Sequence, residues 1–466
     1  MNLEKQCHPM HGSLLMLWFI TIGAFSTLHA QIKVENLVAE EQLHYPLALL
    51  KGTCHDEAPH ITIHDKNDPN HSLTFTSVDG QFKALWMLNE GGNTLVLNDG
   101  INVPTTFPLN YSPIESGKWI RPVYLLASDS DGTFDAPAGE ANNTQSAVQR
   151  LSLGALLMQT FMAEKMSEAG YGRKTFRLKY DQESMPKVEV IRTSNKVDDY
   201  FQTQSSKGDY AYYSMVLGDL ANLPERDGSK DIVIPSFTRY DGGTRTIQGH
   251  TALGIDRLGL FSSATLHTWA ESIDQIADRF SDTTRIDTSE LFDDSVGRGT
   301  HWANYATGLG ATLHELGHTL GLPHTDQYNS MPKTGIMWRG FDNLNLAFML
   351  QQPDDASTYY DDEAGAFWHP ESARLLNRSA WMHPPTSGFP NSNLVPHIHS
   401  QENRILLRWN ANPGTSYQVL FSETINTKTW TPVFQSIQAT SDEVVLNKLK
   451  PTSNTGFYQI QTGAQP

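Results

Sequence analysis

Short hydrophobic runs that alternate with polar residues fill the chain from residue 31 to about 112. Residues 60–64 and 94–97 alternate in this way, and clusters of Gly, Asp and Asn such as 79–80 and 99–100 separate the runs. Alternation with a period of two buries one face of a strand, and such clusters favour turns. The pattern predicts an all-β region over residues 31–112, with the turn spacing of a β-sandwich.

Apolar residues at three- and four-residue spacings predict a long helix over residues 144–169, which Gly170 ends. A second helix is expected over residues 302–320, and a third should begin near Pro370, whose fixed φ suits a first helical turn. Strand-like runs lie between these helices, at residues 122–127, 187–191, 212–216 and 231–235. The pattern therefore predicts a mixed region over residues 113–383 and a chain of the α+β class.

A segment rich in Pro, Ser and Asn covers residues 384–400 and predicts a linker. Further strand-like runs follow it, at residues 404–409, 416–420 and 456–460. They predict a small C-terminal β module over residues 401–466, similar to fibronectin-type or immunoglobulin-like sandwiches. At about 66 residues the module is small for a full sandwich, so packing on the preceding domain is the alternative.

The N-terminal segment contains an apolar stretch from Leu14 to Phe25, followed by Ser26-Thr27-Leu28-His29-Ala30, which ends in a small residue. This pattern predicts a signal peptide over residues 1–30 that is cleaved before Gln31. The apolar stretch is shorter than the roughly 20 residues that span a bilayer, and an uncleaved anchor is the alternative. We expect a secreted or periplasmic protein with no membrane span after signal cleavage.

Charge and cysteine content narrow the choice of partners. The chain has 34 Lys and Arg against 51 Asp and Glu, a net charge of −17. This balance argues against nucleic-acid binding, which needs a basic face. The acidic stretch 354–363 lacks ordered ligand spacing, so a solvated loop is favoured over a calcium site.

Signal cleavage would remove Cys7 and leave Cys54 alone, and we interpret Cys54 as a small buried hydrophobe.

Residues 314–324 read HELGHTLGLPH and carry the candidate chemistry. Helical residues advance about 100° each, so His314 and His318 share one face, one turn apart. Gly321 can adopt a positive φ, end the helix and turn the chain back, which brings His324 to the same point. Three imidazoles at about 2.0–2.1 Å leave the fourth position of a tetrahedral zinc free for water. We predict one catalytic Zn²⁺ per chain, with these three histidines as ligands.

Glu315 neighbours the first predicted ligand and is the predicted general base. Zinc lowers the pKa of a bound water toward about 7, and a carboxylate beside it can take the proton as the water attacks a peptide carbonyl. The alternative is a buried amphipathic helix whose histidines only pack. The complete spacing of three ligands and one base favours the metal site.

The extended motif resembles that of the metzincin clan of zinc endopeptidases, as does Gly335-Ile336-Met337-Trp338 downstream. The resemblance implies a metzincin-like peptidase domain in which Met337 lies in a tight turn beneath the zinc ligands. A second resemblance, to a little-characterised metallopeptidase family known largely from fungi and also bacteria, covers most of residues 31–380. It is carried by residues 45–47, 80–85, 132–135, 170–176, 250–254 and 335–348.

Arg339 departs from some metzincins, which have a tyrosine two residues after the turn methionine. A guanidinium can donate to a substrate carbonyl or pair with a carboxylate, and the structural pairing is favoured.

The clan also pairs extended substrate with an edge strand that precedes the active helix. By chain order this strand would be His250–Leu253 or Leu258–Ser262, and an interior strand is an equal alternative. His250, His267 and His301 are interpreted as ordinary polar residues, because three histidines already complete the zinc site.

The motif predicts a secreted zinc-dependent endopeptidase that acts on protein or peptide substrates. One alternative is a non-catalytic adhesin or glycan-binding protein in which the zinc site is a scaffold. Another is a zinc hydrolase of amides other than proteins, because the chemistry is the same. Glu315 separates the first alternative from an enzyme, since a scaffold needs metal ligands but no general base.

Export should remove residues 1–30 and leave Gln31 as the new N-terminus, because the small-residue site follows the apolar stretch directly. N-terminal sequencing of extracellular or periplasmic protein measures this. Recovery of Met1 in membrane-bound protein would support the anchor instead.

Overall fold

The computed structural model describes residues 32–181, 184–325, 335–353, 366–384, 397–401, 404–411, 416–422, 431–439, 443–449 and 457–462. The predicted signal peptide, the acidic stretch 354–363 and most of the predicted linker lie outside these residues. None of the helices within the described ranges is both long and apolar enough to cross a membrane.

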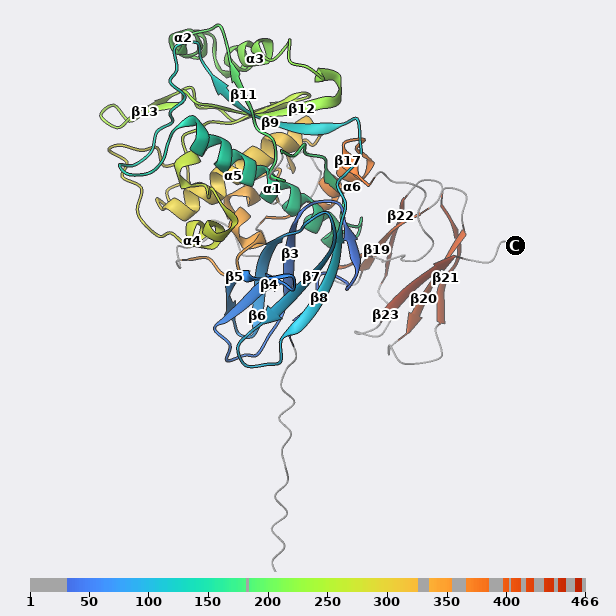
Figure 1. Cartoon of the computed structure of the whole chain (residues 1–466). Helices are drawn as coiled ribbons and strands as arrows, with labels where there is room; N and C mark the ends of the chain where they lie inside the picture. The colour runs from blue at the N-terminus through green and yellow to red at the C-terminus, as the bar shows by residue number, and fades with distance from the viewer. Residues whose placement is uncertain are drawn as a thin grey trace, which may run out of the picture.

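The N-terminal region is all-β, as predicted, and folds as one curled sheet of eight strands (Figure 1). Its strands are β1 Lys33–Val34, β2 Glu41–Leu43, β3 Leu47–Thr53, β4 His60–Asp65, β5 Asp68–Val78, β6 Gln81–Met87, β7 Gly91–Asn98 and β8 Thr105–Tyr111. They lie in the order β1-β3-β6-β5-β4-β7-β8-β2. The long strand β5 pairs with β4 and, at its end, with β6. The region is therefore a continuous bent sheet in which both halves share β5, where the sequence pattern had predicted two packed sheets.

Alternate residues of β3 face two different cores. Ala48 and Leu50 point into the core enclosed by the curled sheet, which also contains the buried thiol of Cys54. Leu47 and Leu49 instead pack in the core formed with the long helix α1, Thr144–Glu168. The outer face of the curled sheet is thus buried against the helical region. The apolar side chains buried between them hold the two parts together.

The middle of the chain contains a five-stranded sheet with the order β11-β9-β12-β16-β15. The strands are β9 Trp119–Leu126, β11 Glu189–Arg192, β12 Ser229–Pro235, β15 Leu253–Ile255 and β16 Leu258–Leu260. Four of them are parallel, and β15 pairs antiparallel with β16 at one edge. The edge of the sheet is thus formed by a short hairpin, β15–β16.

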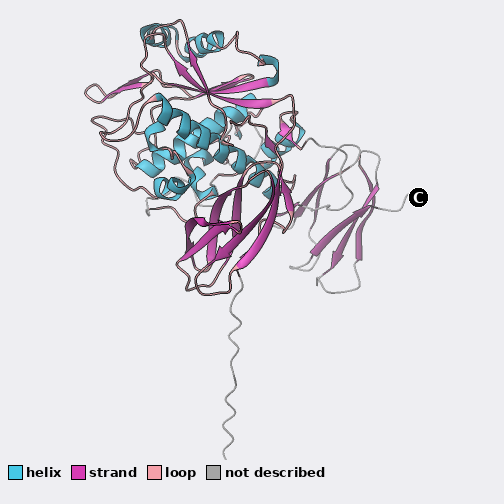
Figure 2. Ribbon diagram, in the orientation of Figure 1, coloured by secondary structure: helices cyan, strands magenta, loops and turns pink. Residues whose placement is uncertain are grey.

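Helices cover both faces of this sheet (Figure 2). The helices are α1, α2 Val197–Lys207, α3 Asp209–Asp219, α4 Ile276–Phe280, α5 His301–Thr319 and α6 Pro370–Arg378, with short 3₁₀ turns η1 Arg226–Gly228, η2 Leu266–Thr268, η3 Ile273–Gln275 and η5 Gly340–Ala347. Val123 and Val233 point toward α2 and α3, whereas Tyr124 and Ile232 point toward α1 and α5. Both faces are apolar because the parallel strands are buried on both sides.

The three predicted helices are confirmed as α1, α5 and α6, with ends within one residue of those expected for the first two. The strand predicted over residues 212–216 is wrong, because these residues lie inside α3. Tyr212, Tyr213 and Val216 are its buried residues, and the spacing of Tyr212 and Val216 is that of one helical face. Aromatic and β-branched residues favour strands locally, but here tertiary packing decides.

The remaining strands form small sheets. The pairs β10 Thr175–Phe176 with β17 Met382–His383, and β13 Arg239–Asp241 with β14 Thr246–Gln248, are antiparallel. The C-terminal strands are β18 His397–Gln401, β19 Arg404–Asn410, β20 Ser416–Ser422, β21 Thr431–Gln438, β22 Glu443–Leu449 and β23 Phe457–Thr462. They form two three-stranded sheets, and Trp409 from one shares a core with Tyr417 from the other. This confirms a C-terminal β region, while the predicted domain boundaries stay predictions.

Arg173 links the curled sheet to α1. Its guanidinium pairs with Glu164 of α1 at 2.9 Å and with Glu41 of β2 at 2.5 Å, and it donates to the backbone oxygen of Asn36. Tyr45 also donates to Glu164, at 2.7 Å. A charge that is mostly removed from water remains stable here because several partners satisfy it.

Replacing Arg173 with Ala should destabilise the protein by about 3–5 kcal/mol, because the buried carboxylate of Glu164 would lose its countercharge. Urea or thermal unfolding measures the change. The matched control is Lys33→Ala, which breaks the exposed Lys33–Glu35 pair and should cost about 0–1 kcal/mol. Equal stabilities of the two variants would contradict the assignment of Arg173 as the link.

Candidate metal centre

Helix α5 carries the first two predicted ligands. It is buried along almost its whole length, and Leu309, Leu313 and Leu316 lie in the core. Three of its residues have no side chain and are approached closely by other segments: Gly308, Gly310 and Gly317. His314 and His318 lie one turn apart, and their rings contact edge to face with centroids 4.7 Å apart. The helix therefore presents two imidazoles on one face, as its sequence predicted.

Gly321 ends α5 as the sequence predicted. Its φ is 89°, a conformation that side chains other than glycine rarely adopt. The amide of Gly321 donates to the oxygen of His318, and the amide of Leu322 donates to the oxygen of Gly317, both at 3.0 Å. These two bonds form a Schellman motif, which satisfies the last carbonyls of the helix and reverses the chain. The reversal brings His324 back over the helix.

The structure brings the three predicted ligands together. The Nε2 atom of His324 lies 3.2 Å from Nε2 of His314 and 3.1 Å from Nε2 of His318. Ligand nitrogens of a tetrahedral zinc, each about 2.0–2.1 Å from the metal, are about 3.3 Å apart. Within the described residues, this is the only cluster of three or more potential metal ligands. The spacing fits one metal ion held by three imidazoles.

Two backbone carbonyls fix the orientation of the rings. Nδ1 of His314 donates to the oxygen of Ile336 at 2.6 Å, and Nδ1 of His318 donates to the oxygen of Leu322 at 2.8 Å. With hydrogen on Nδ1, each Nε2 presents its lone pair toward the centre of the cluster. Such outer hydrogen bonds set the tautomer and position of metal-binding histidines.

Burial keeps the first two histidines neutral. It lowers the pKa of His314 to about 3, with smaller contributions from neighbouring charges that include Arg339. Burial also lowers the pKa of His318, and His324 lowers it further. Neutral imidazole is the form that binds a metal, so the cluster is ready to bind at neutral pH.

Glu315 lies next to the first histidine and is 5% exposed. Among the described residues, none donates a hydrogen bond to its carboxylate, and burial raises its pKa to about 8. A cation bound beside it would favour the ionised form again. Glu315 thus has the proximity and the perturbed pKa of a proton acceptor.

A turn over residues 335–342 packs against α5, the helix that carries the first two histidines. The Sδ atom of Met337 would lie 2.5 Å from a Cβ placed on Gly317, and the oxygen of Phe341 would lie 2.1 Å from one on Gly310. Met337 also accepts a hydrogen bond through its backbone oxygen from Thr325, next to the third ligand. Met337 therefore packs directly against α5.

Arg339 pairs with a carboxylate, which was the favoured interpretation. Its Nε lies 2.8 Å from Oδ2 of Asp342 and its Nη2 lies 3.0 Å from Oδ1 of the same residue. Asp342 is buried and also accepts a hydrogen bond from Thr307 of α5, at 3.2 Å. This network ties the turn to α5 two helical turns before His314.

The β15–β16 hairpin approaches α5 from another side. A Cβ on Gly254 would lie 2.2 Å from the backbone oxygen of Glu315 and 2.8 Å from Cβ of His318. A Cβ on Gly259 would lie farther from the same peptide group, 3.2 Å from the carbonyl carbon of Glu315. The sequence indicated a strand here but did not reveal this contact. The one sequence signal for the contact was the presence of glycines within a strand pattern.

The other histidines near the motif do not join the cluster. His250 contacts the hydroxyl of Ser262 through Nδ1 at 2.8 Å, and Nδ1 of His301 faces Asp282 at 3.4 Å. His267 is fully buried, which lowers its pKa to about 3. None of the three lies with the ligand cluster within the described residues.

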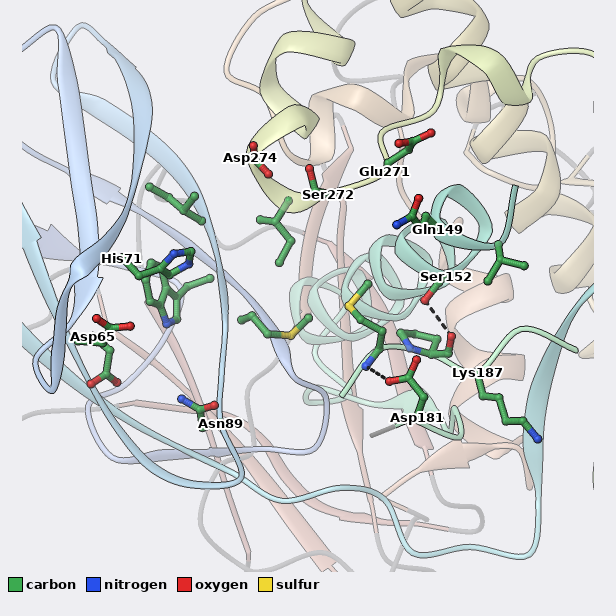
Figure 3. Close-up of a pocket in the computed structure, with 18 of the residues that line it drawn as sticks. Asp65, His71, Asn89, Gln149, Ser152, Asp181, Lys187, Glu271, Ser272 and Asp274 are labelled. Atoms are coloured by element: carbon green, nitrogen blue, oxygen red, sulfur yellow. Dashed lines mark hydrogen bonds between the residues drawn. The ribbon is translucent and has the colours of Figure 1, made fainter. Parts of the chain in front are cut away.

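A separate cavity of about 1200 Å³ lies between the curled sheet, the start of α1, residues 185–188 with Asp181, and the segment 271–274 (Figure 3). Five carboxylates line it, those of Asp65, Asp68, Asp181, Glu271 and Asp274. Glu271 is paired with the buried Arg150 at 2.9 Å. Neither the three histidines nor Glu315 line this cavity, so it is not the metal centre.

A helix with two histidines and an adjacent glutamate, closed by a third histidine after a glycine turn, defines a metallopeptidase-type centre. The chain belongs to the Metallopep family, described as a putative peptidase family, whose match covers residues 31–412. The metallopeptidase family indicated by the sequence is confirmed.

Two curated relatives come from fungi. A putative zinc metalloproteinase of Saccharomyces cerevisiae is 28% identical over 69% of this chain and 49% of its own length. A putative zinc metalloproteinase of Schizosaccharomyces pombe is 28% identical over 73% of this chain and 60% of its own length. The chain thus spans about half the length of the curated relatives it matches.

Solved structures of OgpA from Akkermansia muciniphila are also similar. The wild-type structure has 16% identity and a TM-score of 0.40, and covers 75% of this chain and 93% of that one. The catalytically inactive form, solved with an O-glycopeptide substrate, has 16% identity and a TM-score of 0.38, and covers 75% and 85%.

Replacing Gly254 with Ala should push the hairpin away from α5, because the new methyl group would overlap the backbone of Glu315. We expect a loss of about 1–3 kcal/mol in stability and weaker zinc binding. The control is Gly218→Ala in α3, where a Cβ meets nothing within 4 Å. Calorimetry and zinc titration test both variants, and wild-type behaviour of Gly254→Ala would contradict the close contact.

Proposed function

We propose that this protein is a zinc-dependent endopeptidase with a metzincin-like catalytic domain, and that it acts outside the cytoplasm. The observation that carries the proposal is the convergence of the Nε2 atoms of His314 and His318 on that of His324, at 3.2 and 3.1 Å, in a helix that also carries a buried glutamate. The names of the two fungal relatives support zinc as the metal. Export is expected from the apolar stretch 14–25.

His314, His318 and His324 would hold one zinc ion per chain. Three neutral imidazoles are a donor set that zinc prefers, and a set of three leaves one tetrahedral position free, as catalytic sites require. The zinc would supply a Lewis acid that acidifies water and polarises a carbonyl oxygen. No further histidine is needed to complete the site.

Glu315 would accept a proton and then donate it. Its carboxylate accepts a proton from the attacking water, and the resulting carboxylic acid gives a proton to the amine that leaves. Water forms the new carbon–oxygen bond and the carbon–nitrogen bond breaks, so the reaction needs no covalent enzyme intermediate. The buried surroundings raise the pKa of Glu315, which suits a group that must hold a proton during the reaction.

The edge strand β15 would bind the substrate. Leu258–Leu260 forms β16, which lies between β12 and β15 and is therefore interior. Leu253–Ile255 forms the edge, and Ile255 is 45% exposed. An extended peptide can add to such an edge as a further strand. Because Gly254 contacts Glu315 and His318, a peptide on this edge would pass beside the metal centre.

The buried glutamate also weighs against a non-catalytic scaffold. A carboxylate that is buried without a hydrogen-bonding partner costs stability, as its raised pKa indicates. A scaffold would gain nothing from that cost. An enzyme uses the same group to move a proton, so the arrangement favours hydrolysis.

Replacing Glu315 with Ala should leave zinc bound but lower peptide hydrolysis by about 10²–10⁴-fold, because the proton acceptor is lost while the ligands stay. Digestion of a mixed peptide library, with zinc content and thermal midpoint measured alongside, tests this. The control Glu290→Ala removes an exposed glutamate and should retain full activity. Equal cleavage by the Glu315→Ala variant and the wild type would refute the mechanism.

A further inference from the structure

We propose that Arg339 contacts the substrate, and that the free edge of its guanidinium donates hydrogen bonds to a backbone carbonyl oxygen of the bound peptide. The inference rests on the proposed peptidase function. It places a substrate-binding group on the side of the metal centre opposite the edge strand β15.

The guanidinium of Arg339 has N–H donors that its pair with Asp342 does not use. Arginine carries five N–H groups in a planar fork. The side-on pair with Asp342 uses the Nε–H and one N–H of Nη2. Among the described residues, no acceptor bonds to Nη1, and the side chain is 36% exposed whereas Asp342 is 3% exposed. Asp342 thus holds one edge of the fork, and the partly exposed guanidinium keeps the Nη1 donors without an acceptor among these residues.

A short chain of ring contacts places Arg339 beside the metal centre. Its guanidinium lies over the ring of Phe341, 5.1 Å from the centroid. The same ring contacts His314 edge to face, with centroids 5.3 Å apart. The charge of Arg339 also contributes to the lowered pKa of His314. Arg339 therefore lies one ring away from a ligand.

The positions of the contacts on α5 show which side Arg339 occupies. Residues 310 and 317, which contact the turn, lie within about 20° of each other around the helix, since each residue advances about 100°. Glu315, which contacts the hairpin, lies about 140° from residue 310. His314 and His318 fall between these two faces. The metal centre thus lies between the hairpin on one side and the turn with Arg339 on the other.

An extended peptide on β15 would use one edge of its backbone for the strand and leave the other edge unpaired. The carbonyls of that second edge need donors, because buried carbonyls without hydrogen bonds are costly. In this proposal the N–H groups of Arg339 that Asp342 does not use supply them. This contact would hold the peptide from both sides beside Glu315.

Local charges favour a neutral acceptor over a carboxylate. Asp342 balances the charge of Arg339 through two hydrogen bonds. Asp294 is also close to both groups, and burial with the charge of Asp342 raises its pKa to about 7. With its charge already balanced, Arg339 gains little from an anion but keeps its hydrogen-bonding capacity. A peptide carbonyl fits this environment.

Steady-state kinetics with one peptide that the wild type cleaves provide the test, using Arg339→Gln, Arg339→Lys and the control Lys207→Gln. Lys207 is an exposed cation at the end of α2, far along the chain from the site. For Arg339→Gln we expect KM to rise roughly 10-fold to 100-fold with kcat changed less than about threefold, because the lost contact is made in bound substrate and transition state alike. Lys207→Gln should match the wild type.

Peptide binding to the Glu315→Ala background, measured by fluorescence anisotropy, gives a readout independent of turnover. Adding Arg339→Gln should weaken binding by the same factor, and by equal amounts for peptides that carry Glu or Gln near the cleaved bond. An effect confined to the Glu peptide would overturn the carbonyl contact in favour of a carboxylate subsite. Unchanged affinity would also overturn it.

Thermal midpoints and zinc contents separate this role from a purely structural one. If Arg339→Gln unfolds or loses zinc while Arg339→Lys restores both folding and full peptide affinity, Arg339 is a brace for the turn and the proposal is wrong. If the wild type cleaves no peptide at all, the proposed function fails as well. Cleavage by the wild type with unaltered kinetics in Arg339→Gln contradicts this inference alone.

Discussion

Helix α5 can present a metal centre because two other segments approach its backbone at glycine positions. The turn 335–342 reaches the helix at Gly310 and Gly317, where any side chain would collide with Phe341 or Met337. The hairpin reaches it through Gly254, whose missing side chain admits the peptide oxygen of Glu315. These contacts fix the helix between two walls, and the histidines occupy the space that remains. The chemistry of the site thus depends on the close packing of these backbones.

The position of the ligands then follows from hydrogen bonds that the same contacts make possible. The turn supplies the oxygen of Ile336 to His314, and the glycine-terminated end of the helix supplies the oxygen of Leu322 to His318. Both bonds orient Nε2 toward the centre, where it meets His324. The curled N-terminal sheet contributes indirectly, because it packs on α1, and α1 packs in the same core as α5. Stability far from the site therefore supports its geometry.

Much of the site could be predicted from sequence because it is local. The three histidines, Glu315 and Gly321 lie within eleven residues, and helical periodicity alone brings two of the ligands together. The main helices were predictable for the same reason. The contact of Gly254 with Glu315 joins residues about 60 positions apart, and no periodicity encodes it. Residues 212–216 were predicted as a strand because local propensity cannot register that Tyr212 and Val216 are buried on one helical face.

The account depends most directly on a zinc ion held by three imidazoles. Metal analysis of the purified, folded protein combined with X-ray absorption at the zinc edge measures both the amount and the ligands. We expect one zinc per chain with nitrogen ligands at about 2.0–2.1 Å, and loss of that zinc in His324→Ala. Folded protein without a transition metal, or a zinc bound without imidazole, would contradict the account.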